Sequence, residues 1–275
     1  MSDSSQLTGQ LARRDFLKYA GIIGGTALAL NHNQILAQAA KAPLGKNKAN
    51  PLSPLRQGVA AYDQTREIEV KAFSNLLTVE GISQNQLNQH IGLYKAYVKK
   101  INDIQAQISV TDPDLLAMNP TYSPYRELHV EQTFALNGAV LHEYYFDNLG
   151  GNKTQPSADF ESVISKEFGS WDNYVSHFKA LGKSARGWVM TAYNLRDHRL
   201  HNYLLDAHNQ LVPFYVMPVL VMDVYEHAYA IDFGVADPAK GRPAYIDAFL
   251  QNADWSKVEE RLDMMLWHSD KASKK

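Results

Sequence analysis

The stretch PVLVMDVYEHAYAIDF, residues 218–233, begins as an apolar run and then places an acid and a histidine four residues apart. A short run of this kind, rich in branched side chains, predicts a buried strand. Asp223 ends the run, and a carboxylate there is costly to bury unless it is paired or bound to a metal. The spacing to His227 is common by chance in a chain with 29 acidic residues and 10 histidines. A structural Asp–His hydrogen bond and a metal site are therefore both open at this point.

Two further strand-like runs precede this stretch, at residues 187–194 and 200–207, and a short polar turn joins them. Apolar spacing of i, i+3, i+4 and i+7 predicts two long helices before the strands, and a proline-marked loop between them is typical of an antiparallel hairpin. We predict an α+β fold, with an N-terminal antiparallel helical hairpin followed by a small three-stranded antiparallel sheet wrapped by helices. The helices are expected over residues 84–109, 124–148, 157–170, 170–185, 242–253 and 255–266.

The N-terminal residues resemble an export signal. Arg13 and Arg14 precede a modestly apolar stretch at 19–30, and small residues at 37–39 suit a signal peptidase. The pattern predicts a twin-arginine export signal over residues 1–39 and a periplasmic or extracellular location. The alternative is a short amphipathic helix that carries two arginines by chance. Because the apolar stretch is short and rich in glycine, we expect no membrane span after signal cleavage.

The mature chain changes character along its length. Residues 40–55 are polar and proline-marked, as in a linker. We expect a helical hairpin domain over residues 56–153, because long helical spacing dominates there. An α/β C-terminal domain is expected over residues 154–275, where shorter helices and strands alternate.

Composition excludes several classes of protein. The net charge is −2 and the chain has no basic run, which argues against nucleic-acid binding. It has no cysteine, so disulfides, thiolate nucleophiles and cysteine-held iron–sulfur clusters are excluded. Any bound metal must therefore be held mainly by nitrogen and oxygen ligands.

Two histidines lie on the apolar faces of the predicted hairpin helices. His142 has large aromatic residues around it at helical spacing, and His90 lies at the centre of its apolar stripe, with Gln89 nearer the edge. Taken alone, each histidine is read most simply as a hydrogen-bonded core residue. Together with Asp223 and His227, they form a set of three imidazoles and one carboxylate. Such a set suits a first-row metal with one position left for solvent.

Five separate stretches carry motifs of one known family. They are DVYEHAY (223–229), HEYYFDNL (142–149), EFGSWDNYVSHF (167–178), SARGWVMTAYN (184–194) and RPAYIDAFLQNADW (242–255). In content and order they resemble the iron/manganese superoxide dismutases, over about residues 80 to 265. The resemblance implies a superoxide dismutase, which converts superoxide to dioxygen and hydrogen peroxide at one manganese or iron ion per subunit.

The resemblance also implies the residues that hold the metal. His142, Asp223 and His227 match the family's ligands, with His90 as the fourth. It further implies a homodimer, in which Glu226 reaches the metal-bound His227 of the partner subunit.

Three residues match positions around the metal of the family. Trp188 corresponds to the tryptophan that lines the active site, and Gln210 would hydrogen-bond the solvent at the metal and tune its proton affinity. In the family, a glycine at the position of Gly138 together with such a glutamine goes with the manganese type. Manganese is therefore slightly favoured over iron.

The first hairpin helix departs from the family pattern by one residue. Aligning the part that contains Tyr97 places Gln89 at the ligand position, whereas aligning the helix start places His90 there. The absence of an extra-residue helical bulge would produce this difference, and burial favours His90 because a ligand must face inward. Tyr97 or Tyr94 would manage protons, but Tyr94 and Ala230 replace the two residues that interact across the family's dimer. The alternative function is a catalytically inactive dismutase-fold protein that acts as a binding or structural module.

Overall fold

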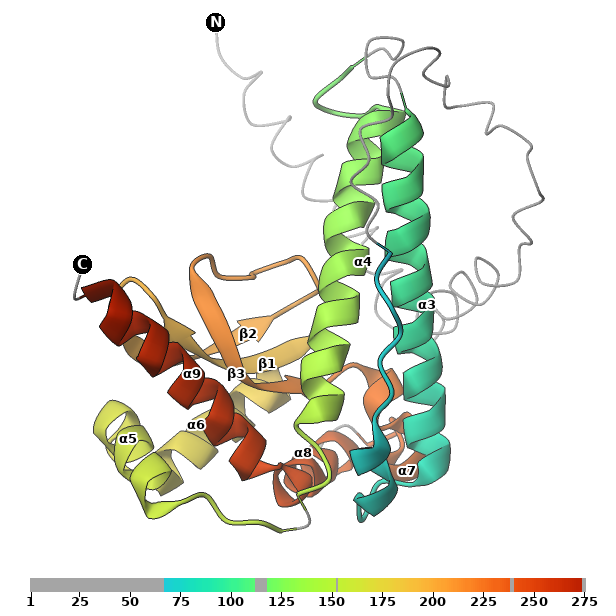
Figure 1. Ribbon diagram of the computed structural model, residues 1–275. Helices are drawn as coiled ribbons and strands as arrows, with labels where there is room; N and C mark the ends of the chain where they lie inside the picture. Colours follow the sequence, from blue (N-terminus) through green and yellow to red (C-terminus); the bar gives the residue numbers. More distant parts are fainter. Residues whose placement is uncertain (1–66, 112–117, 152, 238–239, 274–275) are drawn as a thin grey trace, which may run out of the picture. The chain divides into compact units, whose positions relative to one another are not determined.

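The computed structural model describes residues 67–111, 118–151, 153–237 and 240–273 (Figure 1). The predicted export signal at 1–39 and the linker at 40–55 lie outside these residues. The division of the mature chain into domains at 56–153 and 154–275 stays a prediction. Within the described ranges, no helix combines the length and apolarity needed to cross a membrane.

Two long helices, α3 (Gln84–Val110) and α4 (Pro124–Asp147), form the antiparallel hairpin that the sequence predicts (Figure 1). Each begins with a serine whose side chain accepts a backbone N–H of the first turn. In α4 a proline follows that serine, where its missing N–H costs nothing. Segment 67–73 and the 3₁₀ helix η1 (Ser74–Thr78) precede α3, and the segment runs along the hairpin.

Three strands form an antiparallel sheet in the order β2-β1-β3. Trp188 opens the central strand and pairs with Asp223, the last residue of β3, so that the tryptophan and the carboxylate lie at the same end of the sheet. The predicted α+β class is confirmed. The strands are β1 (Trp188–Asn194), β2 (Arg199–Leu205) and β3 (Val216–Asp223), and the remaining helices are α5 (Ala158–Phe168), α6 (Trp171–Ser184), η3 (Glu226–Ala228), α7 (Ala230–Phe233), α8 (Gly241–Asn252) and α9 (Trp255–Ser273).

A polar clamp joins the end of α4 to β3. The side chain of Asn148 donates to the carbonyl of Val221 at 2.6 Å. Buried Arg261, from α9, donates to the carbonyl of Val219 at 3.0 Å and pairs with Asp147 at 2.6 Å. Because the bonds to Val221 and Val219 are buried and those of Arg261 are charge-assisted, they fix the last turn of α4 against the strand that ends in Asp223.

A candidate metal centre

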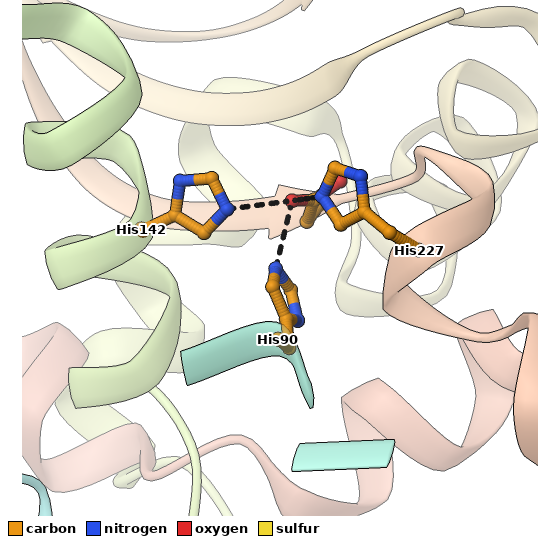
Figure 2. Close-up of side chains that lie close together, drawn as sticks. His90, His142 and His227 are labelled. Carbon is orange, nitrogen blue, oxygen red and sulfur yellow. Dashed lines mark hydrogen bonds and ion pairs between the residues drawn. The ribbon is translucent and has the colours of Figure 1, made fainter. Parts of the chain in front are cut away.

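Four side chains from different elements converge at the end of β3 (Figure 2). His90 comes from α3, His142 from α4, Asp223 from β3 and His227 from η3. Their ligand atoms all lie within 4.8 Å of one another. From Asp223 Oδ2 the distances are 3.1 Å to His90 Nε2, 3.0 Å to His227 Nε2 and 3.7 Å to His142 Nε2. The set predicted from the sequence is thus brought together in space.

One nitrogen of His142 is aimed into the cluster without a hydrogen bond. His142 Nδ1 donates to the carbonyl of Gly138 at 2.6 Å, which leaves Nε2 as the unprotonated nitrogen of a neutral ring. Among the described residues, Nε2 is buried and has no hydrogen-bond partner. A buried lone pair of this kind is costly unless something binds it, and a metal ion would do so. The donor set therefore fits a metal of the iron or manganese type.

The electrostatics of the cluster suit metal ligands. Burial lowers the pKa of both His90 and His142, so their rings are neutral, which is the form that binds metals. Burial alone would raise the pKa of Asp223, but the charge and hydrogen bond of His227, together with the hydrogen bond of His90, hold that pKa well below its ordinary value. The site thus offers two neutral imidazoles, those of His90 and His142, beside one carboxylate anion.

Of the two residues considered for the fourth ligand position on α3, His90 is the one that lies in the cluster. His90 is fully buried, whereas Gln89 is exposed and its amide contacts the side chain of Asn85 at 3.3 Å. The helix is α-helical from Gln84 to Val110 without a bulge. Tyr97 lies seven residues after His90, nearly two full turns, and therefore on the same face.

A histidine that the sequence analysis missed lies beside this face. Trp188 Nε1 donates to His208 Nδ1 at 2.9 Å, and His208 Nε2 is 2.8 Å from the hydroxyl of Tyr97. Because an indole N–H can only donate, Nδ1 must accept and Nε2 must carry the ring proton. His208 therefore donates to the oxygen of Tyr97, whose own O–H proton is left to donate elsewhere.

The structure places Gln210, which the resemblance sets beside the metal-bound solvent, at the protein surface. Gln210 is exposed, and the buried side chain that reaches Tyr97 is that of His208, two residues earlier. The carbonyl of His208 accepts from Asn137 of α4 at 2.9 Å, which turns this part of the loop inward. The loop has no helical or strand periodicity, so the sequence carried no signal for which of its side chains is buried.

Tyr94 is held within its own subunit. Its hydroxyl accepts from the backbone N–H of Lys71 at 2.9 Å and donates to Glu143 at 3.1 Å, and Lys71 pairs with Glu143. Burial raises the pKa of Tyr94 to about 12. These bonds join segment 67–73, α3 and α4 one turn beyond His90.

The other expected residues surround the cluster. Trp188 is fully buried, and its ring centroid lies 5.0 Å from that of His142. Glu226 is exposed, next to His227, whose side chain is 17% exposed. His227 is therefore the residue of the cluster nearest to solvent.

Comparisons with known proteins agree with this architecture. The model of the C-terminal domain of the iron/manganese superoxide dismutases matches residues 156–261. Superoxide dismutase [Fe] of Aquifex pyrophilus is 38% identical over 200 residues, or 72% of this chain and 92% of the relative. The corresponding protein of Aquifex aeolicus is 39% identical over 188 residues, or 67% and 86%. Superoxide dismutase [Mn] 1 of Halobacterium salinarum is 31% identical over 130 residues, or 46% and 62%. The chain belongs to the iron/manganese superoxide dismutase family.

Proposed function

We propose that the protein is an active superoxide dismutase, which converts two superoxide anions and two protons into dioxygen and hydrogen peroxide. The observation that carries the proposal is the cluster of three imidazoles and one carboxylate, with His142 Nε2 aimed into it and, among the described residues, without a hydrogen bond. An iron or manganese ion bound by this cluster would supply a one-electron redox couple.

The protein supports the cluster by fixing the ligands from behind. The carbonyl of Gly138 holds the ring of His142 in one tautomer. Asp223 Oδ1 accepts from the backbone N–H of Tyr225 at 2.9 Å, which leaves Oδ2 facing the imidazoles. The hydroxyl of Tyr245 donates to the carbonyl of Asp223 at 2.6 Å and steadies the end of β3.

Tyr97, His208 and Trp188 would manage protons. Peroxide formation consumes protons. The hydrogen bonds from Trp188 to His208 and from His208 to Tyr97 keep the Tyr97 hydroxyl oriented as a donor. Burial raises the pKa of Tyr97, so the hydroxyl keeps its proton at neutral pH. Tyr94 is hydrogen-bonded to Lys71 and Glu143, and its role would be to hold α3 against α4.

Iron is the resident metal that we propose first. The preference for manganese rested on Gly138 together with Gln210, and Gln210 is exposed. Two of the relatives, at 38% and 39% identity, are iron superoxide dismutases by name. Elemental analysis of protein expressed with both metals supplied measures which one is bound.

Assembly and location follow as further parts of the proposal. Exposed Glu226 beside His227 supports a homodimer in which each glutamate reaches the partner subunit's His227. Arg13 and Arg14, with the apolar stretch that follows them, support export by the twin-arginine route. Export of a folded protein would let the metal be loaded first.

The decisive experiment combines metal analysis with a superoxide-decay assay on the purified protein. We expect close to one metal ion per subunit and an activity that scales with metal content. His142→Ala should lose both, whereas His177→Ala, at an exposed histidine of α6, should keep both. If the protein is metal-loaded but inactive, and His142→Ala changes neither property, the result would instead favour an inactive binding module. The altered residues Tyr94 and Ala230 are the observation that supports this alternative.

A further inference from the structure

A buried amide links the start of α3 to the backbone of His227. Gln86 lies in the first turn of α3 and is 1% exposed. Its Nε2 donates to the carbonyl of His227 at 2.5 Å, and its Oε1 accepts from the backbone N–H of Ile231 at 2.9 Å. Because a carbonyl can only accept and an N–H can only donate, the two partners determine which end of the amide faces which. One side chain therefore holds both η3 and the start of α7.

The segment that Gln86 holds is too short to be stable by itself. η3 has three residues and α7 has four, and helices of this length are marginal without tertiary contacts. The first N–H groups of a helix have no partner within it, and Ile231 is the second residue of α7. A carboxylate oxygen of Asp232 adds a second tie to α3, since it accepts from the backbone N–H of Ser83 at 2.6 Å. The position of the segment is thus set from the start of α3.

Two of the four cluster residues depend on their backbones for position. His142 Nδ1 and Asp223 Oδ1 each have a hydrogen bond behind them. His90 Nδ1 is buried and, among the described residues, has no hydrogen-bond partner. His227 belongs to η3, and its ring stacks on that of Tyr225 with the centroids 5.2 Å apart. The rings of His90 and His227 therefore stay in place only if α3 and η3 are held against each other.

Gln86 joins these two backbones directly. It precedes His90 by four residues, about one helical turn, and so lies on the same face of α3. Its amide bonds the carbonyl of His227 itself. The imidazoles of His90 and His227 face the same oxygen of Asp223, at 3.1 Å and 3.0 Å (Figure 2). Any sliding of α3 against η3 that separates the two imidazoles must break a buried hydrogen bond, which costs free energy.

We propose that Gln86 is a positioning residue for the metal. Its amide holds the backbone of His227 at a fixed place relative to His90, so that both imidazoles reach one ion. The inference rests on the metal site of the proposed function and adds to it a residue outside the four ligands. Residues that orient metal ligands typically contribute a factor of about 10–100 in metal affinity. Metal binding and the two bonds of Gln86 should therefore strengthen each other.

Metal affinity, compared with the stability of the metal-free protein, tests this role. Gln86→Met keeps about the volume of the side chain and removes both hydrogen bonds. Asn102→Leu is the matched control, because the amide of Asn102, also on α3, bonds the backbone N–H and carbonyl of Ile68 at 3.0 Å and 2.9 Å. Competition for Mn²⁺ with a chelator should show a dissociation constant raised about 10–100-fold by Gln86→Met and unchanged by Asn102→Leu. Urea unfolding of the metal-free proteins should show that both variants are less stable than the wild type.

A purely structural role for Gln86 gives a different result. Gln86→Met would then lower the free energy of unfolding of the metal-free protein and leave the Mn²⁺ affinity unchanged, which would overturn the proposal. An equal loss of affinity in Asn102→Leu would do the same. Wild-type protein that binds metal without consuming superoxide contradicts the proposed dismutase, while the affinities still decide on Gln86. Wild-type protein that binds no metal contradicts both.

Hydrogen exchange in the wild-type protein gives a second measurement, which does not depend on how a variant folds. Oε1 of Gln86 accepts the N–H of Ile231, and Oδ1 of Asn102 accepts the N–H of Ile68. Because coupling is reciprocal, metal loading should slow the exchange of the Ile231 N–H about 10-fold or more and change that of the Ile68 N–H less than about two-fold. Equal slowing at both amides, or none at Ile231, contradicts the proposal.

Discussion

Replacing Gly138 by alanine tests the fit between the two hairpin helices at the metal centre. A Cβ atom at residue 138 would lie 2.8 Å from Tyr97 Cδ1 and 3.0 Å from Cε1 and Cγ, where ordinary contacts begin at 3.4 Å. The tyrosine ring is buried and cannot swing into solvent. The substitution should therefore push the ring away from α4 and lengthen the 2.8 Å bond to His208.

The expected loss of stability can be worked out from opposing effects. Overpacking of a buried site costs about 1–3 kcal/mol. A weakened hydrogen bond adds up to about 1 kcal/mol. Alanine in place of glycine within a helix stabilises the folded state by about 1 kcal/mol. The free energy of unfolding should therefore change by a net loss of about 0–3 kcal/mol. Because the Tyr97 hydroxyl is displaced, the superoxide-decay rate per bound metal should fall as well.

Gly92 in α3 provides a matched control. It is helical and exposed, and a Cβ there has no atom within 4 Å. Gly92→Ala should therefore raise the free energy of unfolding by about 0.5–1 kcal/mol and leave the activity unchanged. Urea unfolding of both variants, with superoxide decay per bound metal, separates helix propensity from steric displacement. Equal stabilisation by both substitutions, with full activity in Gly138→Ala, would refute the reasoning.

Three further outcomes are expected. His208→Gln can still accept from the indole and donate to the tyrosine, so it should fold and remain active, whereas His208→Leu leaves the indole N–H unpaired and should cost about 1–3 kcal/mol in urea unfolding. Asp223→Asn removes the single anion of the cluster, and elemental analysis should find less than about a tenth of the wild-type metal, with the fold retained by circular dichroism. Burial raises the pKa of Tyr145, Tyr174 and Tyr245, so the folded state keeps protons that the unfolded state releases above about pH 10. The contribution of these tyrosines to stability is thus complete below pH 10. As the pH rises further, each of them should lower the free energy of unfolding by roughly 1.4 kcal/mol per pH unit. Unfolding curves and tyrosinate absorbance at rising pH check this.

Much of the fold could be predicted because it rests on local periodicity. The apolar spacing along α3 and α4 and the runs that became β1, β2 and β3 have the period of the element that they form. The same reasoning placed His90 inside, because α3 is regular and position along a regular helix determines which way a side chain faces.

The loop after β2 could not be read in this way. Gln210 and His208 differ by two residues, and in an irregular segment that spacing does not determine direction. The bond from Asn137 to the carbonyl of His208 and the acceptor needed by Trp188 select the histidine. Asn137 and Trp188 lie outside this loop in the sequence, so their contacts with His208 are known only from the folded structure.

The regularity of α3 sets the angle between His90, the proposed metal ligand, and Tyr97, the proposed proton donor. Over seven residues an ideal helix returns to within about 20° of its starting direction, whereas one inserted residue would rotate Tyr97 by about 100°. In this chain the phase between His90 and Tyr97 is set by an unbroken helical repeat and not by a local defect. The length of that interval is therefore part of the active site as much as any side chain, and it tolerates substitution far better than it tolerates insertion.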